Sequence, residues 1–385
     1  MVNLSLLFDK LKTYKIDFIT GVPDSLLNDF CLYAESSLEK EKHIIAANEG
    51  NAIAIAAGYH IATGKIPIVY MQNSGIGNAM NPLLSLTHQT VYSIPMILFI
   101  GWRGGGGSAG SDWVQHVKQG TLTPVLMDNM NIPYHIVDND EAAIDLFVWA
   151  AEKAKSIHSP VALIVKKGIL SKEKKEQIYP KDSWLMSREE LMDIVLDFLP
   201  EDTVYIATTG RAARELHALK SIKKMPHDCE FLNVGAMGHA SSIALGMALG
   251  SPKRRIVCFD GDSAAIMHLG ALTTIGKISP CNFMHIILNN GVHESVGGQL
   301  SAGQTADMTA IAEASGYNTI KKPVKNKQEL LNAIEFLLTI DGPAFIDVHI
   351  RQGIREDMPL LNISHIAMKE NLMENLNKNL LGNKC

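Results

Sequence analysis

The sequence is poor in cysteine and in long hydrophobic runs, and it carries no excess of positive charge. Its five cysteines are scattered, odd in number and without a C-x-x-C pair. We therefore expect reduced thiols in a cytoplasmic protein rather than a disulfide framework or a zinc site. The longest apolar run, around residues 94–102, is too short to span a bilayer, so no membrane partner is expected. A net charge of −5 argues against nucleic acid as the main partner.

The chain does contain enough apolar residues for two ordinary domains. Of its 385 residues, 46% are hydrophobic and 19% are charged, so a sizeable core can form. Apolar, β-branched runs alternate with alanine-rich stretches, an order that predicts an α/β fold with parallel sheets and helices on both faces. The predicted strands are Ile16–Thr20, Ile66–Met71, Met96–Ile100, Val161–Val165, Val204–Ala207, Ile256–Phe259, Met284–Leu288 and Phe345–His349.

The two halves of the chain resemble each other. Gly58 matches Gly246 and Ser74 matches Asp262, both at an offset of 188 (246 − 58 and 262 − 74). In each half a helix with small residues leads into a strand that ends in a polar, glycine-bearing loop. This repeat predicts two domains of one architecture, each binding a ligand at the carboxyl ends of its strands.

Polar side chains follow two of the predicted strands in the second half. Asp260 and Asp262 end one apolar run, and Asn290 follows the next. Parallel neighbouring strands end at the same sheet edge, so we expect these oxygen ligands to converge on Mg²⁺, with phosphates completing its coordination. Ser263 opens a predicted helix over residues 264–275, whose first amides can bind phosphate. The aspartates could instead cap that helix, and Asn-Asn-Gly could be a plain turn.

Gly261-Asp262-Ser263, followed by Asn289-Asn290, resembles the G-D-G…N-N signature of thiamine-diphosphate-dependent 2-keto acid decarboxylases. Ser263 stands where that family usually has glycine. The strings GVPDSLL (21–27) and NNGVHESVGGQ (289–299) are similar to the phosphonopyruvate decarboxylases of this family and, less closely, to the sulfopyruvate decarboxylases. The resemblance covers nearly the whole chain and leaves out the middle domain of larger members.

The resemblance implies two similar doubly wound domains. A pyrimidine-binding domain would occupy residues 1–168, a linker residues 169–187, and a diphosphate-binding domain with a C-terminal helix residues 188–385. The linker also lacks a clear apolar period and is rich in Lys and Glu, as expected of a segment between domains.

The resemblance also assigns residues to the cofactor, thiamine diphosphate. Glu49 would hydrogen-bond N1′ of the aminopyrimidine, the Gly235 carbonyl would accept from the 4′-amino group, and Met237 would support the bent cofactor. Weaker candidates for contacts with the diphosphate are Thr209, Gly210, Ser263 and His293. Taken alone, Glu49 could be an exposed charge at a helix start and Met237 a core residue.

The resemblance also implies a set of metal ligands. Asp262, Asn290 and the carbonyl of Val292 would ligate Mg²⁺. Asp260 does not match a ligand, and we expect it to orient the metal-binding loop without touching the ion.

The implied reaction is addition of the cofactor ylide to the 2-keto group, loss of CO₂ and release of an aldehyde. With 3-phosphonopyruvate the product would be phosphonoacetaldehyde, which would place the enzyme in phosphonate biosynthesis. Candidates for substrate binding are Asp24, Ser25, Arg103, His116 and Lys118, of which His116 is also a candidate catalytic residue. The last three could equally be ordinary surface residues. The glycine-dense loop Trp102–Trp113 is expected to close over the substrate.

The resemblance further implies a homo-oligomer, a dimer or higher, with Glu49 and Asp262 of one site on different chains. Sulfopyruvate or another 2-keto acid remains an alternative substrate. An apolar strand ending in Asp-x-Asp is also typical of metal-dependent, nucleotide-sugar glycosyltransferases, although that function gives Glu49 and Asn290 no role. A protein that only senses thiamine diphosphate is a further alternative.

Overall fold

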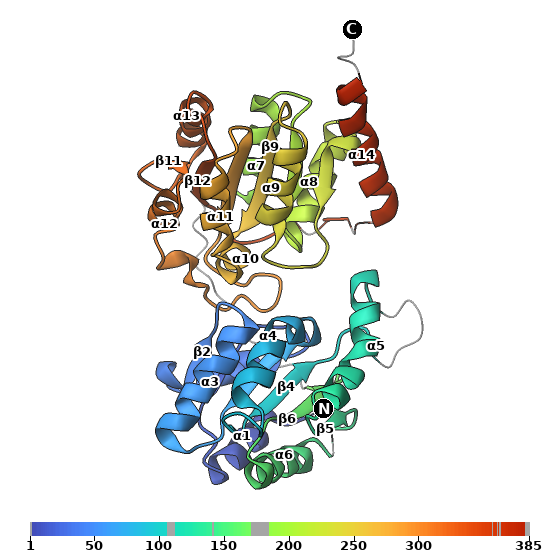
Figure 1. Ribbon diagram of the computed structural model, residues 1–385, viewed down its shortest axis with the longest axis vertical. Coiled ribbons are helices and arrows are strands. Elements are labelled where there is room, and N and C mark those ends of the chain that lie inside the picture. The colour runs from blue at the N-terminus through green and yellow to red at the C-terminus, as the bar shows by residue number, and fades with distance from the viewer. Residues whose placement is uncertain are drawn as a thin grey trace. The chain divides into compact units, whose positions relative to one another are not determined.

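The computed structural model describes residues 2–105, 112–140, 142–170, 185–355, 357–359, 361 and 363–381. The chain divides into two compact units (Figure 1). One comprises residues 1–177 with 296–299, and the other comprises residues 178–295 with 300–385. Each unit is built around its own six-stranded parallel sheet.

In the first unit, alternate side chains of the strands face two apolar clusters, one on each side of the sheet. In sheet order the strands are β2 (His43–Ile45), β1 (Ile19–Gly21), β3 (Ile68–Gln72), β4 (Ile97–Gly101), β6 (Val161–Val165) and β5 (Tyr134–Val137). One face is covered by α1 (Leu4–Thr13), α2 (Asn28–Ser37) and α6 (Ala143–Ile157). The other is covered by α3 (Glu49–Thr63), α4 (Ile76–Pro82) and α5 (Val114–Asn129).

The second unit repeats this plan. Its strands in sheet order are β8 (Glu230–Leu232), β7 (Val204–Ala207), β9 (Ile256–Gly261), β10 (Phe283–Asn289), β12 (Ala344–His349) and β11 (Asn318–Thr319). One face carries α7 (Arg188–Phe198), α8 (Arg211–Ile222) and α13 (Lys327–Leu338). The other carries α9 (Ala240–Gly250), α10 (Asp262–Met267), α11 (Ala271–Ile278) and α12 (Met308–Ala314). The C-terminal helix α14 (His365–Leu381) packs on β8 and on a short 3-10 turn, η4 (His227–Cys229).

The two sheets have the same strand order when their strands are counted from the start of each unit, which is 2-1-3-4-6-5. Strand β3 begins at Ile68 and β9 at Ile256, again 188 residues apart (256 − 68). The predicted fold of two similar doubly wound sheets is therefore confirmed. Both central strands are followed directly by polar residues, so each unit offers a binding edge at the same place.

The helix predicted over residues 264–275 is wrong as a single element. The chain leaves the helical conformation at His268 and starts again at Ala271, which gives two short helices, α10 and α11. Gly270 lies in the break, where glycine weakens helix continuation. A Cβ on Gly238 would lie 2.5 Å from the His268 ring, so a neighbouring loop packs tightly against this break.

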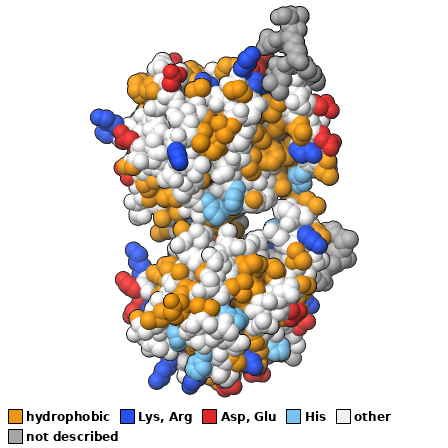
Figure 2. Space-filling view, in the orientation of Figure 1, with side chains coloured by type: hydrophobic (Ala, Val, Ile, Leu, Met, Phe, Trp, Pro, Cys, Tyr) orange, Lys and Arg blue, Asp and Glu red, His pale blue; other side chains and the backbone are white. Residues whose placement is uncertain are grey.

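Other features concern the broad class of the protein rather than its candidate site. No helix in the described part of the chain is long and apolar enough to cross a bilayer. On the face shown in Figure 2, Lys and Arg side chains lie singly among Asp and Glu side chains. Cys31, Cys229, Cys258 and Cys281 are free thiols. Most of the predicted linker, and six residues of the predicted loop 102–113, lie outside the described residues.

Candidate active site

The predicted metal ligands of the second unit lie at one edge of its sheet. Strands β9 and β10 pair in parallel with Leu288 opposite Gly261, so Asp262 and Asn290 leave the sheet on the same side. The Asp262 carboxylate accepts a hydrogen bond from the Ser301 hydroxyl. The Ser301 amide donates to the Gly291 carbonyl at 2.9 Å. Ser301 thus links the two ends of the predicted site.

The loop after β10 is held by its own side chains. Asn290 Oδ1 accepts from the Val292 amide at 3.2 Å, and Asn290 Nδ2 donates to Glu294 at 3.2 Å. These contacts use the amide nitrogen of Asn290 for positioning and point its oxygen toward the turn that contains Val292. Carboxylate, amide and carbonyl oxygens are the ligands that Mg²⁺ prefers.

The polar groups at this edge fit a cation with a phosphate ligand. Only 2% of Asp262 is exposed, and this burial raises the pKa of its carboxyl to about 6 when no cation is bound. The hydroxyls of Ser263 and Thr208 are also buried and have no hydrogen-bond partner within the described ranges. Buried hydroxyls left without partners at the start of α10 and at the end of β7 are suited to a bound polar ligand.

Two other predicted residues near this edge are buried. Asp260 is fully buried; its Oδ1 accepts from the Gly261 amide at 3.0 Å and its Oδ2 lies 3.5 Å from His285 Nε2. This position suits a residue that orients the loop from beneath. Burial lowers the pKa of His293 to about 4, so His293 is neutral at pH 7 and would not contribute a positive charge to diphosphate binding.

An ion-pair network behind Asn290 is not evident from the sequence. Glu294 pairs with Arg188 at 2.5 Å and with Arg211 at 3.1 Å, and Arg188 also pairs with Glu215 at 2.8 Å. These residues come from α7, α8 and the loop after β10, so no spacing pattern connects them. The network fixes the carboxylate that positions the Asn290 amide.

The segment predicted to hold the cofactor's pyrimidine end follows β8. Ala236 has a φ of +46° and Gly238 a φ of +84°, and Asn233 Nδ2 donates to the Ala236 carbonyl at 3.3 Å. The positive φ at a non-glycine residue is held by this bond and by close packing at Gly238. Gly235 and Met237, both half-buried, flank Ala236 in this tight turn.

In the first unit, Glu49 begins α3 and is only 5% exposed. Asn78 Nδ2 donates to Glu49 Oε2 at 2.7 Å. A Cβ on Gly75 would lie 2.3 Å from Glu49 Oε1, so only glycine leaves room for the carboxylate there. Glu49 is therefore a buried and oriented carboxylate rather than an exposed helix-start charge. The sequence predicts neither contact: Gly75 stands out only as the glycine of the polar loop in the repeat, and Asn78 belongs to no motif.

The predicted substrate residues Ser25 and Arg103 come together, but Arg103 is not a free cation. Its guanidinium makes a bidentate pair with Asp112, at 2.7 Å and 2.5 Å, and its third nitrogen donates to Ser25 at 3.0 Å. Burial opposes ionisation of Asp112, yet the hydrogen bonds from Arg103 hold the pKa of Asp112 well below its usual range. Asp112 is thus a site residue that the sequence did not indicate.

Asp24 lies beside this pair and is completely buried. Gln72 Nε2 donates to it at 2.7 Å, and a Cβ on Gly101 would lie 2.1 Å from its Oδ2. Burial raises the pKa of Asp24, which favours the protonated form. This environment suits a group that handles a proton better than one that binds an anion.

The remaining substrate candidates differ in position. Burial and the nearby Arg103 lower the pKa of His116, and its Nδ1 is buried without a hydrogen-bond partner among the described residues. Lys118, on the same helix α5, is exposed, and its predicted role stays a prediction.

Comparisons with known proteins cover both units. Residues 3–131 match the family model for the thiamine pyrophosphate enzyme N-terminal TPP binding domain. Residues 208–348 match the model for the C-terminal TPP binding domain of the same enzymes. Thiamine pyrophosphate is the same compound as thiamine diphosphate.

Three curated relatives extend over most of the chain. A phosphonopyruvate decarboxylase of Streptomyces viridochromogenes is 31% identical, covering 87% of this chain and 85% of its own. Another from Streptomyces hygroscopicus is also 31% identical, covering 92% of this chain and 88% of its own. A sulfopyruvate decarboxylase of Methanosarcina acetivorans is 25% identical, covering 89% of this chain and 90% of its own.

Proposed function

The chain belongs to the phosphonopyruvate decarboxylase family of thiamine-diphosphate-dependent enzymes, and we propose that it converts 3-phosphonopyruvate to phosphonoacetaldehyde and CO₂. The observation that carries this proposal is the similarity to two phosphonopyruvate decarboxylases over both units of the chain. A glycosyltransferase is set aside, because both halves match thiamine pyrophosphate enzyme domains.

Residues of the second unit fit the metal and the diphosphate. Asp262, the Asn290 side-chain oxygen and the Val292 carbonyl would hold Mg²⁺. Ser263 and the Thr209-Gly210 turn would contact phosphate oxygens. They lie at the starts of α10 and α8, where free backbone amides can bind phosphate. When bound, thiamine diphosphate supplies the carbon nucleophile and accepts the electrons released as CO₂ leaves.

Glu49 would hold the proton that the pyrimidine ring needs. Its carboxylate is buried, and Asn78 fixes one of its oxygens. The other oxygen, Oε1, would then share a proton with ring atom N1′. This hydrogen bond would form away from water, where such bonds are strong. In the proposed homo-oligomer, Gly235 and Met237 of another chain would support the same ring.

Arg103 and Ser25 would bind the phosphonate group. Asp112 fixes the guanidinium plane, and Nη1 donates one of its two N–H groups to Ser25. The second N–H group of Nη1 and the Ser25 hydroxyl proton would then donate to the phosphonate oxygens. Buried Asp24, with its raised pKa, would supply a proton for the product aldehyde. His116 is a second candidate for proton transfer, since its lowered pKa leaves it neutral near pH 7.

We expect a homo-oligomer in which each active site combines Glu49 of one chain with Asp262 of another. The four described cysteines are free, which supports a reducing compartment such as the cytoplasm. Size-exclusion chromatography with light scattering tests the first expectation, which a monomer with full activity would contradict.

Sulfopyruvate is the second candidate substrate, because a single-chain sulfopyruvate decarboxylase also matches nearly the whole chain. A panel of phosphonopyruvate, sulfopyruvate and pyruvate separates the possibilities by kcat/KM. We expect the highest value for phosphonopyruvate. A higher value for sulfopyruvate would transfer the assignment to that acid, and equal values for pyruvate and phosphonopyruvate would remove the claim of specificity.

A further inference from the structure

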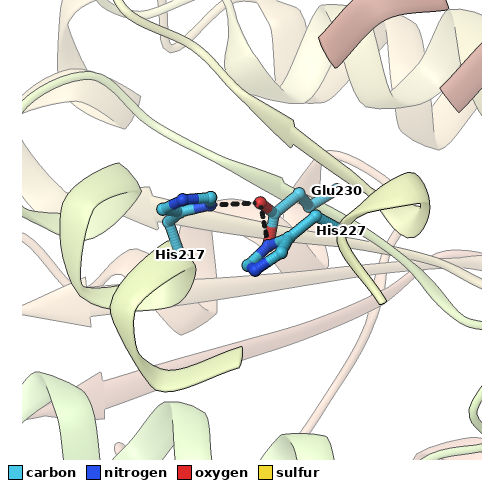
Figure 3. A group of neighbouring side chains, drawn as sticks. All are labelled: His217, His227 and Glu230. Carbon is cyan, nitrogen blue, oxygen red and sulfur yellow. Dashed lines mark hydrogen bonds and ion pairs between the residues drawn. The ribbon is translucent and has the colours of Figure 1, made fainter. Parts of the chain in front are cut away.

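Three metal-ligating side chains gather in the second unit, away from the candidate active-site edge (Figure 3). His217 belongs to α8, His227 to η4, and Glu230 begins β8. Both histidine Nδ1 atoms point at one carboxylate oxygen, Glu230 Oε1, at 2.6 Å for His217 and 2.8 Å for His227. Their ligand atoms all lie within 4.8 Å of one another. We propose that these residues form a second metal site, which binds a zinc-like divalent ion.

The hydrogen bonding of His227 makes Nδ1 the ring atom that faces Glu230. The Ser221 hydroxyl donates to the His217 carbonyl at 3.0 Å and lies 3.0 Å from His227 Nε2. With the single hydroxyl proton used in that way, His227 Nε2 must be the donor. Nδ1 then faces the Glu230 carboxylate at 2.8 Å, a contact that either a ring proton or a metal ion can bridge. In the proposed site a metal ion takes the place of that proton.

The charges around the site select the kind of metal. The buried Lys220, 1% exposed, places its Nζ 3.7 Å from Glu230 Oε2 and offsets the carboxylate charge. A hard cation such as Mg²⁺ or Ca²⁺, which depends on anionic oxygen ligands, gains little here. Zn²⁺ gains most of its affinity from imidazole nitrogens, two of which are available.

The site is anchored on one side and open on the other. The Glu230 side chain is 1% exposed, whereas those of His217 and His227 are 20% and 37% exposed. An ion could therefore enter from solvent, and water could complete a tetrahedral arrangement with the three protein ligands. The present spacing is that of hydrogen bonds, so binding requires the imidazoles to move apart slightly from the carboxylate.

An ion at this position would stabilise the segment on which the C-terminal helix packs. The 3-10 turn η4 contributes Asp228, whose Oδ2 accepts from Asn375 of α14 at 2.9 Å. By joining η4 to α8 and β8, the ion would hold Asp228 in place for that contact. The proposal thus predicts a stability effect as well as binding.

The test is calorimetric titration of the holoenzyme with ZnCl₂, in excess thiamine diphosphate and Mg²⁺ so that the catalytic metal site is filled. We expect about one Zn²⁺ per chain and a rise in the melting temperature. His217→Ala and His227→Gln should each weaken binding by about tenfold or more. Gln at position 227 still offers a hydrogen-bond donor to Glu230, so a role in hydrogen bonding alone would survive this change. His88→Ala, which removes a partly exposed histidine of the first unit, serves as the matched control.

Equal Zn²⁺ affinity in the wild type and both site variants would overturn the proposal. So would displacement of the bound Zn²⁺ by millimolar Mg²⁺, or an equal loss of binding in His88→Ala. Decarboxylase activity and circular dichroism, measured on each variant without Zn²⁺, show whether it is folded. Because Glu230 is the buried member, the variants alter only the two partly exposed histidines. The outcome is independent of which 2-keto acid the enzyme uses.

Discussion

The Asp262→Asn substitution is expected to stabilise the cofactor-free protein while it inactivates the enzyme. The carboxylate is almost completely buried, and burial raises its pKa to about 6 from an ordinary value of 3.8. Asparagine has nearly the same shape as aspartate, and its side-chain oxygen can still accept the hydrogen bond from the Ser301 hydroxyl. The substitution therefore removes a buried charge without opening a cavity.

The size of the effect follows from linkage. At about 1.4 kcal/mol per pKa unit, the difference between about 6 and 3.8 corresponds to about 3 kcal/mol at pH 8. Because the folded-state pKa is raised, this destabilisation of the wild type is absent below pH 3.8, grows as the pH rises to about 6, and is complete above it. For a unit of this size the variant should melt about 6–12 °C higher at pH 8.

Thermal melts at pH 8 and pH 4, with and without Mg²⁺ and thiamine diphosphate, provide the assay. Mg²⁺ with the cofactor should stabilise the wild type and leave Asp262→Asn nearly unchanged, since the variant has lost a metal ligand. The control is Asp307→Asn, the same chemical change at an exposed N-cap of α12, where Asn caps as well as Asp. A cofactor-free variant less stable than the wild type at pH 8 would refute the reasoning.

Three further predictions follow from the first unit. Glu49→Gln should lower kcat by about 100-fold or more and leave Mg²⁺-dependent cofactor binding, measured by calorimetry, largely intact; unchanged turnover would remove the role of Glu49. Gly75→Ala should lower kcat as well, because its Cβ would lie 2.3 Å from the Glu49 carboxylate, whereas Gly77→Ala, with nothing within 4 Å, should not. Burial lowers the pKa of His43 to about 4, so the free energy of unfolding should fall as the pH drops from 6.5 toward 4. This fall should be smaller in His43→Gln. The same pH dependence of the unfolding free energy in both proteins, measured by urea titration at each pH, would contradict this.

Central strands could be predicted from the sequence because they are buried on both faces and appear as continuous apolar runs. Val161–Val165 and Val204–Ala207 have the predicted bounds. Strand β2 was missed because its three residues are all half-buried, and β5 because only one of its four residues, Val137, is fully buried. Such short edge strands form through pairing with a neighbour, and local composition carries little of that signal.

The same distinction applies to the site. Asp262 and Asn290 could be singled out because neighbouring parallel strands end at one sheet edge, which is the register that β9 and β10 have. Their role as metal ligands stays a prediction. Asn78 and Arg188 could not be singled out, since their partners Glu49 and Glu294 lie 29 and 106 residues away. Asp112 is only nine residues from Arg103, but nothing in the loop's composition indicates that the two side chains pair. Their contacts depend on the tertiary fold, and they are the groups that orient Arg103, Glu49 and Asn290.

The most direct test of the central claim is reconstitution of the metal-free, cofactor-free protein with 3-phosphonopyruvate, followed by phosphorus NMR. We expect conversion to phosphonoacetaldehyde, with release of CO₂, only when thiamine diphosphate and Mg²⁺ are both added. Conversion at the same rate without either of them, or no conversion by the folded, cofactor-loaded protein, would contradict it.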